Sequence, residues 1–146
     1  MGPIPIKKAI VAVAGAGTRF LPATKTMPKE MLPIVDKPII QLVVEELVEA
    51  GIQDIILVTK WDKKSLEDHF DYNWALANEL REAGKLKQLE EITRISEMAN
   101  FVYIRQRGLM GRVRRYSLPR AWYSTNRSSM CGVMILCAQR CPSPNR

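Results

Sequence analysis

The sequence predicts an α/β fold whose strands form one parallel sheet. Three short apolar runs, each long enough for one buried strand, recur at residues 8–13, 54–58 and 101–105. Segments with helical apolar spacing separate these runs, and strands that alternate with helices form right-handed parallel sheets. A chain of 146 residues has room for one domain, and its 47% hydrophobic content suffices for a core.

The predicted fold begins with a buried strand that is followed by a long loop. Lys8–Val13 is apolar on both faces, which is typical of a central parallel strand. We expect residues 14–37 to form a loop, because Pro22, Pro28 and Pro33 exclude a long helix. Parallel sheets bind ligands at the carboxyl ends of their strands, so this loop lies where a ligand is expected.

Four helices are predicted between the later strands. Residues 38–50 carry apolar side chains at helical spacing, with Pro38 at the start and Gly51 at the C-terminal cap position. Asp62 is expected to cap a second helix that ends near Phe70. The remaining two helices are predicted at residues 73–83 and 85–99, separated by Gly84. This order of elements indicates a Rossmann-like sheet.

The loop reads AGAGTRFLPATKTMPKEML over residues 14–32 and carries the strongest functional signal. Its glycines let the backbone approach a phosphate and point N–H groups at it. Arg19, Lys25 and Lys29 would offset the charge of a polyphosphate. The loop lacks the Gly-Lys-Ser/Thr of a Walker motif and the third glycine of a dinucleotide fingerprint. Taken alone, its glycine-rich part is equally consistent with a structural turn.

Longer motifs favour a ligand site in this loop. The glycines are followed by Leu21-Pro22-x-Thr24-Lys25 and then by PKEMLPIVDKP at Pro28–Pro38. These motifs resemble the signature of sugar-phosphate nucleotidyltransferases, and the second is similar to the bacterial UTP–glucose-1-phosphate uridylyltransferases. The similarity continues to the strand FVYIRQ and covers residues 6–108, about the first third of a family member. It implies an incomplete form of that family's three-layer, Rossmann-like nucleotidyltransferase fold.

The resemblance implies an enzyme that transfers UMP from UTP to glucose 1-phosphate and releases pyrophosphate, with Mg²⁺ as cofactor. Such a reaction needs no covalent intermediate, so catalysis is mostly positioning and charge neutralisation. The resemblance implies catalytic roles for Arg19 and Lys29, with Lys29 reaching the α-phosphate and the sugar phosphate. The implied nucleotide-binding residues are Ala14, Gly15, Gly17, Thr18, Arg19, Lys29 and Gln106. The first two of them and Gln106 would contact the uracil, and the others would hold the phosphates.

The sequence also carries signals for the cellular location and the partners of the protein. It has no apolar run of 18 residues, and its N-terminus does not predict a signal peptide. The first 108 residues contain no cysteine, which fits a reducing cytoplasm. The resemblance implies a homo-oligomer that uses UTP and glucose 1-phosphate, without a membrane or nucleic-acid partner.

Several features depart from the family pattern. Val13 stands beside the nucleotide where the family has a smaller residue. The glycine-rich stretch expected after Gln106 and the aspartate that would hold Mg²⁺ are absent in this frame, so we expect no metal ligand and little turnover. Lys25 fits a solvated loop cation equally well, and Glu30 is expected to be structural, paired with a nearby cation.

The composition changes near Gly108. Residues 1–108 hold 15 basic and 15 acidic residues, whereas residues 109–146 hold seven Arg, all three cysteines and no Lys, Asp or Glu. A basic tail suggests nucleic acid, but this one has neither a helical pattern nor an aromatic stripe, and its cysteine spacing does not suit zinc. We expect residues 109–146 to be a basic tail that is disordered or translated out of frame.

The genetic code permits a specific test of the second alternative. Read one base earlier, the codons for Leu109–Gly111 can encode Pro-Tyr-Gly, and those for Met130–Ile135 can encode x-Val-Trp-Gly-Asp-Asp. These are residues that the resemblance requires at such places. The degenerate code permits this reading without requiring it, and we hypothesise a frameshift after about Gly108.

Two other functions stay open at this point. One is another nucleotidyltransferase of the superfamily, acting on thymidylyl or guanylyl groups, although PKEMLPIVDKP and the helical insertion at residues 73–99 disfavour it. The other is a noncatalytic module whose basic tail binds nucleic acid. His69 is expected on a helix surface, and Trp61 and Trp74 are expected to pack.

Overall fold

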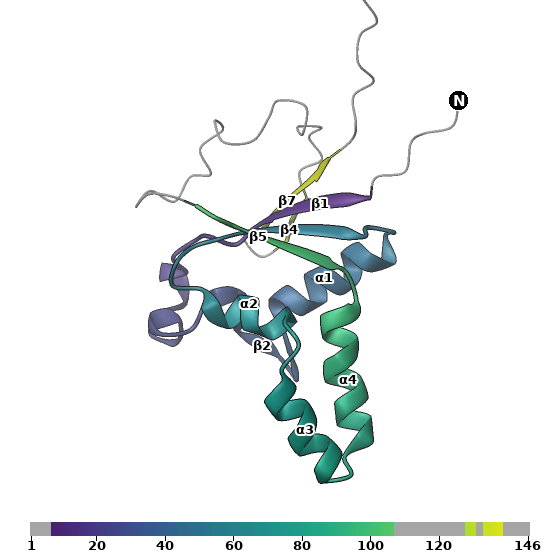
Figure 1. The fold of residues 1–146 in the computed structure, drawn as a ribbon. Coiled ribbons are helices and arrows are strands. Elements are labelled where there is room, and N and C mark those ends of the chain that lie inside the picture. The colour runs from purple at the N-terminus through teal and green to yellow at the C-terminus, as the bar shows by residue number, and fades with distance from the viewer. Residues whose placement is uncertain (1–6, 107–127, 131–132, 139–146) are drawn as a thin grey trace, which may run out of the picture.

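The computed structural model describes residues 7–106, 128–130 and 133–138, and for the last two ranges it describes only the backbone. These residues form a mixed sheet with the strand order β5-β4-β1-β7-β6 (Figure 1). The strands are β1 (Lys8–Ala12), β4 (Asp54–Thr59), β5 (Asn100–Arg105), β6 (Ser128–Met130) and β7 (Val133–Ala138). The first three strands pair in parallel, as the three apolar runs predict.

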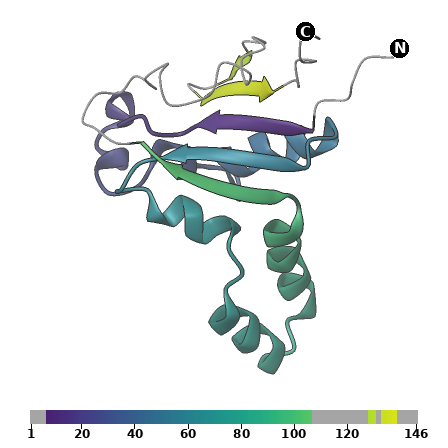
Figure 2. The same cartoon turned by 45° about the horizontal axis from the view of Figure 1, so that its top comes forward.

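Four helices connect these parallel strands. They are α1 (Ile39–Glu49), α2 (Lys64–Phe70), α3 (Trp74–Glu82) and α4 (Leu86–Glu97). All four lie on one face of the sheet, and the α3–α4 hairpin projects away from it (Figure 2). The α/β class and the parallel arrangement are therefore confirmed. The described residues form two layers of the expected three, in agreement with an incomplete fold.

The core lies between the helices and the face of the sheet that they cover. Alternate residues of β1 and β4 point into it, including Val11, Ile55 and Leu57, each with no exposed surface. The helices contribute residues at helical spacing, among them Ile40 from α1 and Phe70 from α2. Phe70 also stacks on Phe101 of β5, with ring centroids 4.5 Å apart. This core holds the carboxyl ends of three strands at one edge.

The cap glycine of α1 agrees with the prediction, the cap of α2 differs from it, and the cap of α3 was not predicted. Gly51 follows α1 with φ of 88°, and the Asn73 side chain accepts a hydrogen bond from the Leu76 N–H at the start of α3. Asp62 does not cap α2, so the cap predicted at Asp62 was wrong. Lys63 occupies the cap position, and Asp62 pairs with Lys60 at 2.9 Å instead.

The predicted loop contains three single turns and a small hairpin. The turns are η1 (Thr18–Phe20), η2 (Ala23–Lys25) and η3 (Lys29–Met31), and the hairpin pairs β2 (Pro33–Ile34) with β3 (Lys37–Pro38). No element in the loop is longer than three residues, as its prolines predict.

Part of the range 109–146 belongs to the sheet. The apolar run Val133–Leu136 lies in β7, which pairs antiparallel with β1, and β6 pairs antiparallel with β7. The expectation of disorder or of a shifted frame for the rest of this range falls outside the described residues. Among the helices that the structure describes, none is long and apolar enough to cross a membrane.

Candidate functional site

The loop after β1 starts at the carboxyl edge of the sheet. The Val13 N–H still donates to the Val58 carbonyl of β4 at 3.0 Å, so the chain leaves the sheet only after this residue. Val13 itself is fully buried in the core. Each of the three turns is closed by at least one backbone hydrogen bond, for example from the Phe20 N–H to the Gly17 carbonyl at 2.9 Å. The loop is thus compact although it contains no long element.

At Gly17 the first part of the loop lies close to Thr24 and Lys29. The φ of Gly17 is 68°, and a Cβ built there would lie 3.2 Å from the Lys29 Cβ and 3.3 Å from the Thr24 Cβ. The Thr24 hydroxyl donates a hydrogen bond to the Gly17 carbonyl at 2.8 Å. A glycine is needed here both for its backbone conformation and for the close approach.

The Lys29 side chain runs alongside Gly15. A Cβ built at Gly15 would lie 3.7 Å from the Lys29 Cε and 3.9 Å from its Nζ. The structure therefore brings together Gly15, Gly17 and Lys29, which are far apart in the loop sequence. An ammonium group beside an exposed glycine backbone is a suitable place for a phosphate group.

Glu30 is buried beneath this cation and forms an ion pair with Lys63. The Lys63 Nζ donates to the Glu30 Oε2 at 2.6 Å, and the two side chains are 3% and 1% exposed. Burial lowers the pKa of Lys63 from its ordinary value, although the hydrogen bond and charge of Glu30 act in the opposite direction. The structure agrees with the expectation that Glu30 pairs with a nearby cation.

Lys63 is the residue of this site that the sequence analysis missed. It lies 33 positions after Glu30 and belongs to a run of charged residues that is typical of a helix start. A glutamate that must be buried inside a loop needs a cation, and this requirement was the only available signal. Nothing local indicated which lysine would meet it.

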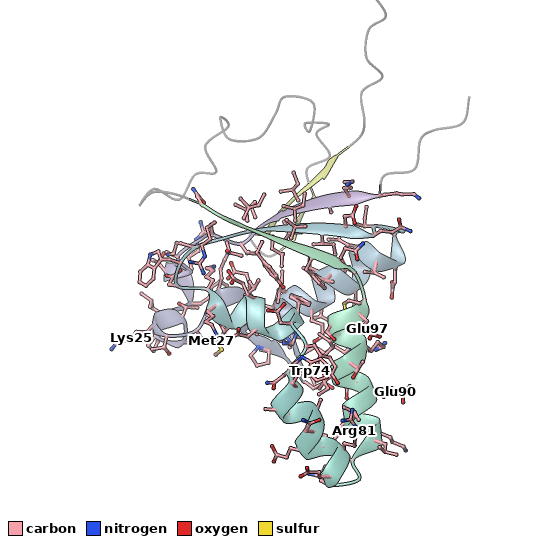
Figure 3. All side chains as sticks on the ribbon, viewed as in Figure 1. Lys25, Met27, Trp74, Arg81, Glu90 and Glu97 are labelled. Atoms are coloured by element: carbon pink, nitrogen blue, oxygen red, sulfur yellow. The ribbon has the colours of Figure 1, made fainter. Side chains whose placement is uncertain are left out.

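A small cavity of about 100 Å³ lies at this place. Its lining residues are Gly15, Ala16, Thr24, Lys25, Thr26, Met27, Pro28, Asp62 and Lys63. Lys25 lines it from the outer end of the loop, where its side chain is exposed and points outward (Figure 3). The volume suits a phosphate group rather than a whole nucleotide, since small-molecule sites measure roughly 300–1,000 Å³.

The remaining predicted site residues are distributed along the same edge. Ala14 is half-buried, and Thr18 and Arg19 are exposed in the first turn of the loop. Gln106 follows β5, and its N–H donates to the Thr59 carbonyl of β4 at 2.9 Å. It therefore lies two strands away from β1 at the carboxyl edge. Their roles toward a nucleotide stay a prediction.

A larger open groove of about 710 Å³ lies elsewhere, between the α3–α4 hairpin and β5. Phe70, Tyr72, Trp74 and Phe101 contribute aromatic surface to it, and Asp71 contributes a carboxylate. Its lining contains no Lys, Arg or His. A polyphosphate therefore fits the smaller cationic site better than this groove.

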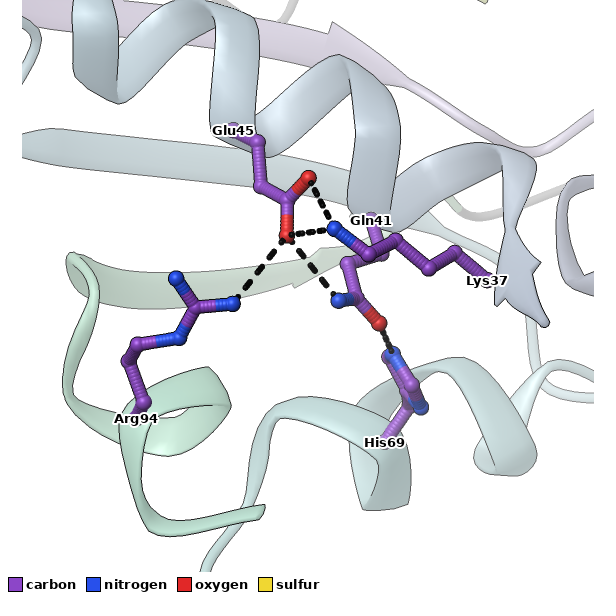
Figure 4. A network of polar contacts seen from close by, with 5 residues as sticks. All are labelled: Lys37, Gln41, Glu45, His69 and Arg94. Atoms are coloured by element: carbon purple, nitrogen blue, oxygen red, sulfur yellow. Dashed lines mark hydrogen bonds and ion pairs between the residues drawn. The ribbon is translucent and has the colours of Figure 1, made fainter. Parts of the chain in front are cut away.

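A polar network joins the helices below the loop (Figure 4). Glu45 accepts hydrogen bonds from Lys37 at 3.0 Å and from the Gln41 amide at 3.0 Å, and Arg94 lies 3.9 Å away. Burial raises the pKa of Glu45, but the hydrogen bonds and the positive charges outweigh this and hold it below its usual range. The network fixes β3, α1 and α4 relative to one another.

His69 belongs to the same network, so the expectation of a plain helix-surface residue was wrong. Its Nε2 lies 3.0 Å from the Gln41 Oε1, and burial lowers its pKa. Because the Gln41 amide nitrogen donates to Glu45, its oxygen accepts, and the His69 Nε2–H is the donor. The packing expectation for the two tryptophans was also wrong, since Trp61 and Trp74 are 77% and 72% exposed.

The described residues do not offer a site for the Mg²⁺ that the resemblance implies. Three or more His, Cys, Asp or Glu side chains do not gather at any place in this part of the chain. The nearest carboxylate to the loop cations, Glu30, is already paired with Lys63. We therefore derive no chemical step through a metal.

The fold and the loop together define a class of protein, an α/β protein whose candidate site lies at the carboxyl edge of three parallel strands. The profile of the nucleotidyl transferase family matches residues 8–106. This match covers more than half of the chain, and the chain belongs to the nucleotidyl transferase family.

Within this family, the chain is similar to proteins named as uridylyltransferases and UDP-glucose pyrophosphorylases. The UTP–glucose-1-phosphate uridylyltransferase of Bacillus subtilis (strain 168) is 59% identical over 102 residues, which is 70% of this chain and 35% of that protein. A UTP-bound UGPase from Acinetobacter baumannii is 52% identical with a TM-score of 0.67, over 69% of this chain and 36% of that one. A UDP-glucose pyrophosphorylase complexed with UDP-glucose is 50% identical with a TM-score of 0.57, over 70% and 36%. The chain spans about a third of the length of these relatives.

Proposed function

We propose that this chain forms the nucleotide-binding part of a UTP–glucose-1-phosphate uridylyltransferase. That enzyme transfers UMP from UTP to glucose 1-phosphate and gives UDP-glucose and pyrophosphate. The observation that carries the proposal is the position of Lys29 beside Gly15 and Gly17, at the carboxyl edge of the sheet. The similarity to uridylyltransferases and to a UTP-bound structure supports the choice of nucleotide.

The reaction is an in-line displacement at phosphorus. A phosphate oxygen of glucose 1-phosphate forms a bond to the α-phosphorus of UTP, and the bond to the leaving pyrophosphate breaks. Lys29 holds the α-phosphate against the incoming sugar phosphate and offsets the repulsion between the two anions. Arg19 holds the outer phosphates, whose negative charge increases as pyrophosphate leaves. Positioning of the two reactants supplies the remaining acceleration.

The base is held at the same edge of the sheet as the phosphates. In this proposal the backbone of Ala14 and Gly15 and the Gln106 side chain contact the uracil, and Gly17 and Thr18 contact the phosphates. Gln106 lies two strands from the loop, so the uracil would lie between Gln106 and the start of the loop, beside the end of β4. We further propose a cytoplasmic homo-oligomer, as the resemblance implies.

Nucleotide binding by the 146-residue chain tests this proposal. We expect UTP to bind more tightly than dTTP or GTP in isothermal titration calorimetry. Lys29→Met should weaken UTP binding about ten-fold or more, because a charged hydrogen bond to phosphate is lost. Lys64→Met is the matched control and should change the affinity less than about two-fold, because Lys64 is 79% exposed and pairs with Asp68 on the surface. Equal or tighter binding of dTTP or GTP would instead favour another member of the superfamily.

The shifted reading frame is part of the proposal. The family match ends at residue 106, and the acidic residues end before residue 109. We propose that the coding frame changes after about Gly108 and that turnover by this chain is slow, because residues 109–146 contain no carboxylate side chain. DNA sequencing from the Arg105 codon onward tests the frame. Stop codons in the alternative frame would refute the shift.

A further inference from the structure

Glu30 lies between the ammonium groups of Lys63 and Lys29, and it is hydrogen-bonded to the first but only ion-paired with the second. Its Oε2 accepts a hydrogen bond from Lys63 at 2.6 Å. Its Oε1 is buried, has no hydrogen-bond partner among the described residues, and lies 3.9 Å from the Lys29 Nζ. The same Lys29 ammonium borders Gly15, where a phosphate is expected. One carboxylate is therefore shared between a structural cation and the cation of the proposed site.

The buried charge of Glu30 requires a cation, and two lysines are close enough to supply it. A buried carboxylate is stabilised only when a cation pairs with it closely. Lys63, which is itself 3% exposed, supplies that partner. If Lys63 were absent, the nearest other ammonium group would be that of Lys29, 3.9 Å from the Glu30 Oε1. This ammonium group needs to move only about 1 Å to make a charged hydrogen bond of ordinary length. A Lys29 ammonium bound to Glu30 in this way would be withdrawn from a phosphate.

We propose that Lys63 is a positioning residue, which saturates Glu30 and thereby prevents Glu30 from drawing the Lys29 ammonium away from phosphate oxygens beside Gly15. This inference rests on the proposed function, because that proposal assigns Lys29 to the phosphates. It gives the buried ion pair a role beyond holding the loop against α2. It also predicts that Lys63 becomes dispensable for phosphate binding once Glu30 has no charge.

Binding of inorganic tripolyphosphate to the full 146-residue chain tests the inference. Calorimetric titrations compare the unmodified chain with Lys63→Met and with the double variant Glu30→Gln/Lys63→Met. We expect Lys63→Met to bind about ten-fold more weakly, because Glu30 captures Lys29. The double variant is expected within about three-fold of the unmodified chain. Lys64→Met is the matched control, since Lys64 is 79% exposed and pairs with Asp68 on the surface.

The outcomes separate this inference from its alternatives. A folded double variant that binds weakly would show that Lys63 itself contacts the phosphates or that the pair only shapes the loop, and it would overturn the inference. Unchanged binding by folded Lys63→Met would also overturn it. In both cases binding by the unmodified chain leaves the proposed function intact. Failure of the unmodified chain to bind tripolyphosphate would overturn the proposed function and the inference together.

A measurement on the unmodified chain covers the case in which the variants do not fold. The side-chain ¹⁵Nζ resonances of lysines report their hydrogen-bond partners by nuclear magnetic resonance. Tripolyphosphate should shift the Lys29 resonance and leave that of Lys63 in place, since Lys63 stays bound to Glu30. A Lys63 shift as large as that of Lys29 would mean that Lys63 binds the phosphate, which contradicts the inference.

Discussion

At residue 17 the neighbouring side chains leave little space for a Cβ atom. Gly17 has φ of 68°, and a Cβ there would lie within 3.3 Å of both Lys29 and Thr24. Gly84, between α3 and α4, has the same φ but no atom within 4 Å of its Cβ position. An alanine at residue 84 would therefore cost only the strain of the left-handed backbone, whereas an alanine at residue 17 would add the cost of the close contact.

Substitution of these glycines by alanine gives the first prediction. Gly84→Ala should lower the free energy of unfolding by about 1 kcal/mol through its left-handed backbone alone. Gly17→Ala should lower it by about 2–3 kcal/mol, because the contact with Lys29 is added. It should also weaken UTP binding. Urea unfolding measures both variants, and equal losses would show that the loop relaxes without strain.

His69 makes the stability depend on pH. Burial lowers its pKa in the folded chain, whereas the unfolded chain titrates near pH 6.5. As the pH falls from about 6.5 through the lower folded value, the unfolded state takes up the proton first, so stability is lost. We expect full stability above this window and a decrease within it. His69→Gln should flatten the decrease in urea midpoints between pH 7 and 5, and an unchanged slope would assign it to other groups.

Among the elements, those with a local signal were predicted and those without one were not. The helices α1, α3 and α4 begin and end within one or two residues of their predicted limits, because apolar spacing, Asn73 and the glycines mark them. The start of α2 was misplaced because Asp62 pairs with Lys60. An aspartate next to lysines has two possible partners, and local sequence does not choose between them.

The cap of α3 gives a prediction at this scale. Asn73→Ala should lower the free energy of unfolding by about 1 kcal/mol, because the Leu76 N–H loses its acceptor. Asn78 lies within the same helix and its side chain only accepts from the exposed Arg81. Asn78→Ala should therefore change stability by less than about 0.5 kcal/mol. Thermal unfolding compares the two, and equal effects would show that the cap contributes nothing.

At the scale of the whole molecule, the important feature is that the described helices cover only one face of the sheet. The four helices lie on one face, while Val102 and Ile104 of β5 are 47% and 39% exposed. Strand β5 also ends the sheet, which leaves its outer hydrogen-bonding groups unpaired by any described strand. Exposed apolar residues on an edge strand promote association between chains.

We therefore expect the chain to be poorly soluble and to associate as its concentration increases. The double variant Val102→Thr/Ile104→Thr should reduce this association, because it makes the exposed face of β5 polar and keeps β-branched residues. Ile34→Thr is the matched control, since Ile34 is 52% exposed but lies on the small hairpin away from the sheet. Light scattering after size exclusion measures the change. A monodisperse monomer at all concentrations would contradict the expectation.

The sequence by itself determined the α/β class, the three parallel strands and the loop of residues 14–37. Apolar runs, helical spacing, prolines and glycines are local signals, and they act on the chain within a few residues. Only the tertiary structure decided which side chains meet across the loop. The pairs Glu30–Lys63 and Gln41–His69 join residues 33 and 28 positions apart, and β7 joins the sheet beside β1. Such pairs depend on the packing of whole elements, which brings distant charges and strands together only after the core has formed.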